Sequence, residues 1–353
     1  MVYSANGATA SGPMGSAEQR FARRLGLHWV APDALTIRRV RRGRGFAFLD
    51  AEGQPVRDRR LTRRLTGLAV PPAYNDVLYA HDPSAHLQAI GRDAAGRLQY
   101  RYHPEWEKIR ERRKARRMLS LIETLPRIRR AITHHLSGEP GSRDYALAAA
   151  IELVAMTSIR AGSEEYARQR GTRGAATLLK SNVAVKRGTI LLSFRGKGGK
   201  PVTKEVHAPR LGRAIANLCK LPGRRLFQFC DEAGEVRQIR AHDINEFLRT
   251  IAGGRISLKD FRTLCASGHV LERLARTVPA RTERQRKRQV LDAVREAADD
   301  LVNTPAICRK SYVHQTVLDA FETGALAKYC AGSSRGGTRR ERLVARVLAN
   351  HVH

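Results

Sequence analysis

The sequence predicts an α+β protein with two domains: a small β-rich N-terminal domain and a larger, mainly α-helical domain that contains a small β-sheet. The chain has 353 residues, more than a single domain usually contains. Short apolar runs between glycine- and proline-containing turns dominate residues 17–107, whereas longer segments of helical periodicity fill residues 108–330. We place the boundary between residues 107 and 108, at the start of a charge-rich helical connector.

The charge balance indicates a polyanionic partner. Lys and Arg number 65 and Asp and Glu 33, which leaves a net charge of +32. The chain cannot neutralise an excess this large internally, so a partner with many negative charges is the first expectation. Aromatic residues make up only 6% of the chain, which argues against a single-strand binder built on stacked bases.

The cysteines and the chain ends carry little functional signal. The five cysteines are widely spaced and form no CxxC pair, so neither a zinc site nor a disulfide framework is expected, and a reducing compartment fits. The sequence contains no run of about 18 apolar residues, so no membrane span is expected. Residues 1–16 are small and polar without an apolar stretch and predict a disordered tail. Residues 331–353 predict a basic tail.

The first domain shows strand signals around one short helix. Apolar runs bounded by turn residues predict strands at residues 46–49, 77–80, 86–92 and 98–103, and a helix near residues 61–68 that ends before Pro71 and Pro72. The arginines between residues 38 and 44 form a dense basic cluster, which is either a solvated surface or a phosphate contact. Gln88 and Arg92 would reach base edges or phosphates if the sheet faces a groove. No glycine pattern for cradling a nucleotide occurs here.

The second domain presents three basic residues at separate structural positions. The nearly apolar segment 145–159 predicts a buried helix, and Arg160 follows it, either to cap the helix or to act on a partner. Strands at residues 189–194 and 201–206 flank a glycine-rich turn that carries Lys197, which serves either solubility or contact with a polyanion. Arg262 lies near the start of a later helix and is also explained as an ordinary surface charge.

The segment from Asn303 to Tyr312 opens like a helix. Thr304 suits the capping position and Pro305 the first helical position. Apolar residues then recur four apart as far as Phe321. Taken alone, this segment is explained better by an ordinary core helix that happens to contain a tyrosine.

Together these side chains supply what phosphodiester cleavage without a metal requires. The reaction needs a nucleophile, cationic donors for the phosphoryl oxygens, and an acid for the departing 5′ oxygen. Arginine binds two oxygens at once and stays protonated, and nearby cations lower the cost of forming a phenolate. The chain offers Arg160, Lys197, Arg262, Asn303 and Tyr312 for these tasks.

The ordered set of motifs resembles the type IB DNA topoisomerases, and within them the compact poxvirus-like form found in bacteria. The segments that carry the resemblance are residues 86–93, 99–103, 159–166, 194–197, 259–263, 303–305 and 310–312. Each motif is weak alone, but their common order over roughly residues 20–325 is specific.

The resemblance implies a role for each residue of the site. Tyr312 would attack the phosphodiester and hold the 3′ phosphate, Arg160 and Arg262 would bind the non-bridging oxygens, and Lys197 would protonate the 5′ oxygen. Asn303 stands where viral members carry histidine and would donate a hydrogen bond to a phosphoryl oxygen.

It also implies a clamp closing around duplex DNA and further DNA contacts. Gln88 and Arg92 match a strand that contacts the major groove in this family, and Tyr166 and Lys259 are weaker candidates. The expected enzyme is a cytoplasmic, nucleoid-associated monomer that uses no metal, no ATP and no small-molecule cofactor.

Two other functions share part of this evidence. Tyrosine recombinases use the same catalytic residue types, but they typically carry histidine at the position of Lys259 and usually lack a β-rich domain like residues 17–107. A non-catalytic basic DNA-binding protein would explain the charge but not the ordered motifs. A metal-dependent nuclease is disfavoured because the sequence shows no clustered Asp, Glu and His ligand set.

Overall fold

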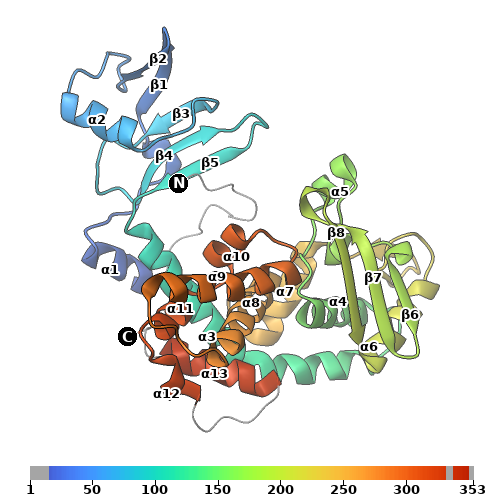
Figure 1. Ribbon diagram of the computed structural model, residues 1–353. Coiled ribbons are helices and arrows are strands. Elements are labelled where there is room, and N and C mark those ends of the chain that lie inside the picture. Colours follow the sequence, from blue (N-terminus) through green and yellow to red (C-terminus); the bar gives the residue numbers. More distant parts are fainter. Residues whose placement is uncertain (1–15, 331–336, 350–353) are drawn as a thin grey trace. The chain divides into compact units, whose positions relative to one another are not determined.

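The computed structural model describes residues 16–330 and 337–349 (Figure 1). The chain divides into two compact units after Arg113, within the helix α3 (Trp106–His135). The division therefore falls inside the predicted connector, which continues without a break into the first helix expected for the second domain. Residues 1–15 of the predicted N-terminal tail lie outside the described residues, and Ser16 begins the helix α1 (Ser16–Arg24).

The N-terminal unit is built around an antiparallel five-stranded sheet with the order β2-β1-β3-β4-β5. Its strands are β1 (Ile37–Arg42), β2 (Gly45–Leu49), β3 (Asn75–Tyr79), β4 (Leu87–Arg92) and β5 (Leu98–Tyr102). The helix α2 (Arg59–Gly67) buries Leu65 against Val77 and Tyr79 on one face of this sheet. Alternation along the strands thus supplies the apolar face that the helix covers.

The strand β1 was not predicted, because its arginines mask a weak apolar signal. Ile37 is its buried residue, and backbone pairing to β2 and β3 completes it. Within the arginine cluster, Arg39 has a structural role: its guanidinium donates to the carbonyls of Val70, Pro71 and Tyr74 at 2.7–3.0 Å. Tertiary hydrogen bonds therefore decide what an arginine in this cluster does.

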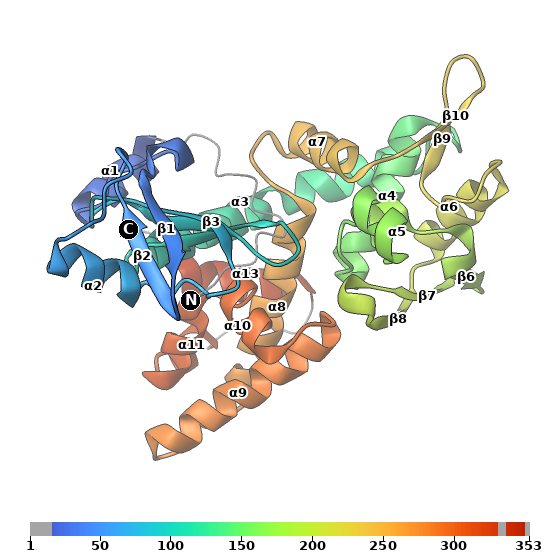
Figure 2. The same ribbon diagram turned by 90° about the horizontal axis from the view of Figure 1, so that it is seen from above.

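The second unit is mainly helical and holds two small sheets, which confirms the predicted α+β class. Beyond α3 its helices are α4 (Arg143–Thr157), α5 (Glu164–Arg170), α6 (Pro209–Lys220), α7 (Ala241–Ala252), α8 (Leu258–Ala275), α9 (Glu283–Asp300), α10 (Pro305–Ser311), α11 (Gln315–Glu322), α12 (Leu326–Cys330) and α13 (Gly337–Ala349). One sheet contains β6 (Val183–Lys186), β7 (Thr189–Arg195) and β8 (Pro201–His207), and the other β9 (Gln228–Cys230) and β10 (Val236–Gln238). In both views the β6–β8 sheet lies with α4, α5 and α6 at one end of this unit, while α9, α10 and α11 lie at the other (Figure 2).

The helix α4 forms the centre of this unit, as its apolar sequence predicts. Side chains from Ala146 to Ile151 are fully buried, and the Ser142 hydroxyl caps the first turn by accepting from the Tyr145 amide. Ser158 ends the helix in a left-handed conformation with φ of 54°. The buried helix thus delivers Arg160 from a sharply turned loop rather than from its own last turn.

The predicted helix through Tyr312 is two helices. Thr304 caps α10 as predicted by accepting from the Ile307 amide, and Pro305 occupies the first turn. The helix stops at Tyr312, whose φ and ψ of −128° and −25° leave the helical region. His314 then caps α11, its ring nitrogen accepting from the Thr316 amide at 3.2 Å. Apolar residues recur at every fourth position across the break, so periodicity alone does not reveal it.

The basic tail predicted for residues 331–353 differs from the structure over residues 337–349. These residues form α13, whose Leu343, Val344, Val347 and Leu348 are at most 4% exposed and join the core of the unit. An apolar helix face outweighs the basic composition here. Residues 331–336 and 350–353 lie outside the described residues. Within the described ranges, no helix is long and apolar enough to cross a membrane.

Candidate active site

Tyr312 lies half-buried at the end of α10, beside two arginines. The Cζ atom of Arg262 is 5.0 Å from the centroid of the tyrosine ring. Burial by itself would raise the pKa of Tyr312, but the charges of Arg262, Arg160 and Lys259 and a hydrogen bond from Arg262 lower that pKa below its usual value of 10.0. The surroundings therefore lower the cost of forming the phenolate, the form that acts as a nucleophile.

Arg262 is held rigidly inside the unit. Its side chain is 3% exposed in the first turns of α8. One terminal nitrogen donates to the carbonyl of Ser158 at the end of α4, and the other donates to the carbonyl of Leu301 after α9 at 3.1 Å. A single guanidinium thus ties the ends of two helices to the position of Tyr312.

Arg160 and Asn303 form a directly bonded pair next to this arginine. Nη2 of Arg160 donates to Oδ1 of Asn303 at 2.5 Å. Burial, followed by the charge of Arg262, lowers the pKa of Arg160, and the phenol of Tyr312 opposes this shift. Asn303 is 9% exposed, and its Nδ2 has no hydrogen-bond partner in the described part of the chain. The pair therefore offers an unused amide donor beside two cations.

A close backbone approach fixes the loop that carries Arg160. The Arg160 carbonyl accepts from the Ala175 amide at 2.8 Å. A Cβ atom at Gly174 would lie 2.5 Å from that carbonyl oxygen, so only glycine fits. Gly162 next to the loop has a φ of 93°, which glycine also tolerates best. These glycines hold the arginine loop against the segment that follows α5.

Lys197 is exposed in the turn between β7 and β8 and lines the same pocket as Arg160 and Arg262. Arg173 and Lys204 also line this pocket, together with the carboxylate of Asp300, which accepts from Lys204 at 2.5 Å. Five cationic side chains and one carboxylate leave the lining net positive, which suits an anion. Arg173 and Lys204 were not predicted as site residues, because neither stands in a recognisable motif.

In the structure the five predicted catalytic residues lie close together, and each contacts another of the five or lines the same pocket. Arg160 bonds to Asn303, Arg262 stacks on Tyr312, and Lys197 shares a pocket with both arginines. Lys259, exposed on α8, acts on Tyr312 through its charge. Tyr166 is half-buried in α5, with the guanidinium of Arg170 5.4 Å from its ring centroid.

Gln88 differs from the expectation that it presents a polar group to DNA. It is 2% exposed, its Nε2 donates to the carbonyls of Pro83 and Ala85 at 2.9 and 2.7 Å, and its Oε1 accepts from Arg64 at 2.6 Å. The loop before β4 consumes its hydrogen-bonding capacity. Arg92, by contrast, is exposed, with one bond to the Gly96 carbonyl and an ion pair of 3.6 Å to Asp76.

Comparison with known proteins identifies the family. Residues 104–330 match the family described as eukaryotic DNA topoisomerase I, catalytic core, and residues 45–93 match the bacterial DNA topoisomerase IB, N-terminal domain. The chain is 30% identical over 266 residues to DNA topoisomerase 1B of Acanthamoeba polyphaga mimivirus, covering 73% of this chain and 79% of the viral protein. It is 23% identical over 292 residues to DNA topoisomerase 1 of Rabbit fibroma virus (strain Kasza), covering 77% and 88% of the two chains. A catalytic-core match over most of the second unit, joined to a bacterial N-terminal domain, confirms the predicted resemblance: the chain belongs to the type IB DNA topoisomerases.

Proposed function

We propose that this topoisomerase relaxes supercoiled duplex DNA by cutting one strand through a 3′-phosphotyrosine link at Tyr312, letting the free 5′ end swivel, and resealing the strand. The observation that carries the proposal is the contact between the buried Arg262 guanidinium and the Tyr312 ring. The clamp expected from the family resemblance stays a prediction.

Cleavage starts with the tyrosine oxygen. Tyr312 loses its phenolic proton to solvent water and its oxygen attacks the phosphorus; a new phosphorus–oxygen bond forms, and the bond to the 5′ oxygen breaks. A phenol at its ordinary pKa of about 10 is a weak nucleophile at neutral pH. The lowered pKa of Tyr312, caused by the charges of Arg262, Arg160 and Lys259 acting against burial, reduces the cost of reaching the phenolate.

Negative charge grows on the non-bridging oxygens during this step, and fixed donors stabilise it. Arg160 and Arg262 supply guanidinium groups that stay protonated and bind two oxygens at once. Asn303 contributes its Nδ2, the buried amide donor that has no partner among the described residues. Because Arg262 and Asn303 are held by packing and by their own bonds, they need little rearrangement when the phosphate arrives.

The departing 5′ oxygen is a strong base and requires a proton. Lys197 lines the pocket with the two arginines and is the general acid of the proposal, with Arg160 assisting. The phosphotyrosine bond conserves the energy of the broken phosphodiester, so attack by the 5′ hydroxyl reseals the strand without ATP. No step is assigned to a metal ion.

The enzyme is proposed to act as a monomer on duplex DNA, in the cytoplasm and on the nucleoid. All five catalytic residues come from one chain, which supports the monomer. The net charge of +32 supports a polyanionic substrate. A tyrosine recombinase is disfavoured because the N-terminal family match covers residues 45–93 and Lys259 stands at the position where recombinases typically carry histidine.

The deciding experiment is plasmid relaxation with EDTA present and ATP absent, run on positively and negatively supercoiled DNA. The wild-type protein should relax both. Tyr312→Phe should bind DNA but form no denaturant-resistant adduct, and relaxation should fall by at least about 10⁴-fold.

Tyr145→Phe is the matched control. Its hydroxyl accepts from Asn217 at 3.2 Å within the core, so this variant should form the adduct like the wild type. A strict requirement for Mg²⁺, or an adduct in Tyr312→Phe, would refute the mechanism.

A further inference from the structure

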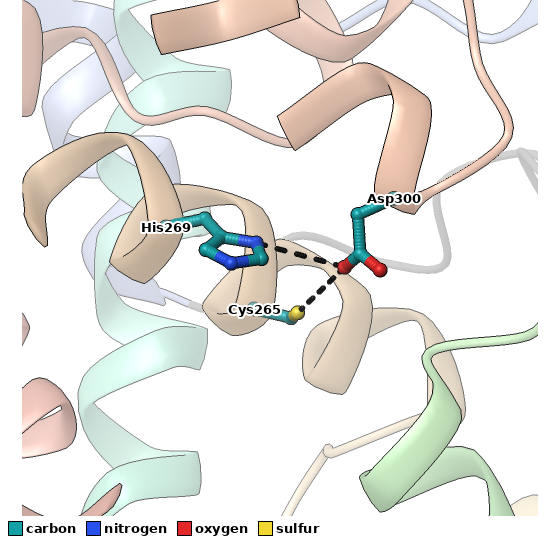
Figure 3. A group of neighbouring side chains, drawn as sticks. All are labelled: Cys265, His269 and Asp300. Carbon is teal, nitrogen blue, oxygen red and sulfur yellow. Dashed lines mark hydrogen bonds and ion pairs between the residues drawn. The ribbon is translucent and has the colours of Figure 1, made fainter. Parts of the chain in front are cut away.

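Three potential metal ligands meet behind the candidate active site. Cys265 and His269 lie one turn apart on α8, and Asp300 is the last residue of α9. One donor atom from each residue lies within 4.8 Å of the other two (Figure 3). The sequence predicts no metal site, because it contains no CxxC pair and no clustered Asp, Glu and His ligand set. The spacing of Cys265 and His269 was a detectable signal, but Asp300 joins them only in the fold.

Oδ2 of Asp300 is the common partner of the other two groups, at distances close to those between ligands of one ion. Nδ1 of His269 lies 3.6 Å from Oδ2 of Asp300, and Sγ of Cys265 lies 3.8 Å from the same oxygen. Ligands at tetrahedral angles around zinc are separated by about 3.3 to 3.5 Å, given metal–ligand distances of about 2.0 to 2.3 Å. The two separations to Oδ2 of Asp300 therefore lie a few tenths of an ångström above those of a tetrahedral site.

The ring nitrogen of His269 that faces Asp300 is ion-paired but makes no hydrogen bond of ordinary length. Nδ1 is buried, has no hydrogen-bond partner within the described ranges, and pairs with Oδ2 of Asp300 at 3.6 Å, which raises the pKa of His269 to about 9, so a metal ion would replace the proton on this ring. Buried polar atoms are ordinarily satisfied. The nitrogen faces the carboxylate of Asp300 in Figure 3, on the side where an ion would lie.

The surroundings prepare the carboxylate for a single metal bond. Lys204 donates to Oδ1 of Asp300 at 2.5 Å and to the Asp300 backbone carbonyl at 2.6 Å. These two bonds orient the carboxylate and leave Oδ2 toward Cys265 and His269. Such outer hydrogen bonds to a ligating carboxylate are the usual support of a metal site.

We propose that Cys265, His269 and Asp300 bind a thiophilic divalent cation of the zinc class. A thiolate, an imidazole and a carboxylate are zinc ligands, whereas Mg²⁺ and Ca²⁺ require oxygen ligands. Three protein ligands leave a fourth position for water. The thiolate and the carboxylate together balance the charge of the ion.

The ion would strengthen the framework of the active site without entering the reaction. It would join α8 to the end of α9, next to Leu301, whose carbonyl accepts from Arg262. Bound metal should therefore raise the melting temperature of the full-length protein. Relaxation in EDTA tests the catalytic proposal separately, so the failure of either proposal is distinguishable from that of the other.

The test is metal titration of chelator-treated full-length protein. Co²⁺ should bind one ion per chain with the intense sulfur-to-cobalt absorption of a thiolate ligand, and Zn²⁺ should displace it and raise the melting temperature. Cys265→Ser should abolish the sulfur band, and both Cys265→Ser and His269→Gln should weaken Zn²⁺ binding by at least about tenfold.

The exposed Cys230 provides the matched control, because Cys230→Ser removes a free thiol outside the cluster. That variant should bind both ions like the wild type. Circular dichroism of the metal-free variants would check that they are folded. Unchanged Zn²⁺ affinity in folded Cys265→Ser, or wild-type protein without saturable binding, overturns the proposal.

Discussion

The guanidinium of Arg262 lies 5.0 Å from the ring centroid of Tyr312 while donating to the backbone carbonyls of Ser158 and Leu301. One buried cation therefore both positions the segment around the tyrosine and lowers the pKa of its phenol against the effect of burial. The two functions are separable, because charge and hydrogen-bonding geometry can be changed independently.

Replacement of Arg262 should move the pH dependence of cleavage. In Arg262→Ala, burial of Tyr312 is no longer offset by this charge, so the pKa of Tyr312 rises and the increase of the cleavage rate with pH shifts to higher pH. Loss of the donor should also slow cleavage by about 10²- to 10³-fold. Single-turnover cleavage of a suicide duplex across a pH series measures both effects.

Arg262→Lys is the matched control for that experiment. It keeps the charge but loses the paired hydrogen bonds, so the pH profile should stay near that of the wild type while the rate falls. If Arg262→Ala and wild type share the same pH profile, the phenolate argument is wrong.

A better leaving group should restore the cleavage rate that is lost when Lys197 is replaced. Lys197→Ala removes the proposed acid from the pocket and should slow cleavage by about 10²- to 10⁴-fold. When sulfur replaces the 5′ bridging oxygen of the substrate, the leaving group is a thiolate, which departs without being protonated. The variant and the wild type should therefore cleave this substrate at similar rates. Arg262→Ala should remain slow on that substrate, and equal rescue of both variants would contradict the assignment.

We expect the Ser267 hydroxyl to hold the backbone at Tyr312 in position. This fully buried hydroxyl of α8 donates to the Tyr312 carbonyl at 3.0 Å and accepts from the His314 amide at 3.1 Å, across the break between α10 and α11. Ser267→Ala should lower stability by about 1–3 kcal/mol and slow cleavage by about 10²-fold at saturating DNA, with DNA affinity unchanged.

Ser142→Ala provides the comparison for Ser267→Ala. It removes the cap of α4 at a cost of about 0.5–2 kcal/mol but touches none of the catalytic residues. Urea unfolding and single-turnover cleavage measure the two variants in parallel. Equal cleavage rates in both would show that Ser267 acts on stability alone.

Variants of Gln88 and Arg92 should differ in their effects: one should change stability and the other DNA binding. Gln88→Ala removes the hydrogen bonds that the Gln88 amide makes to backbone carbonyls and to Arg64. The loss of these buried bonds should lower the stability of the protein by about 1–3 kcal/mol. Arg92→Ala should leave stability nearly unchanged but weaken DNA binding and reduce the slope of log affinity against log salt by about 1. Salt-dependent binding curves together with thermal melts of both variants decide the matter, and the reverse pattern would reinstate Gln88 as a DNA contact.

The sequence alone determined the features that depend on neighbouring residues. The apolar run of α4, the glycine-rich turn around Lys197 and the Thr304–Pro305 start of α10 follow from local propensity and periodicity, and each is present in the structure. The order of the motifs also determined the family, since a linear pattern is all that such a comparison needs.

Only the tertiary structure decided what depends on residues that are far apart in the chain. The Ser267 hydroxyl bonds to the backbone at the Tyr312 break, Arg64 bonds to the buried amide of Gln88, and α13 packs on α8. The meeting of Cys265 and His269 with Asp300 likewise requires α8 and α9 to pack side by side. Periodicity reports which face of a segment is apolar, whereas the partner of a buried polar group is fixed only when the whole chain has closed around it.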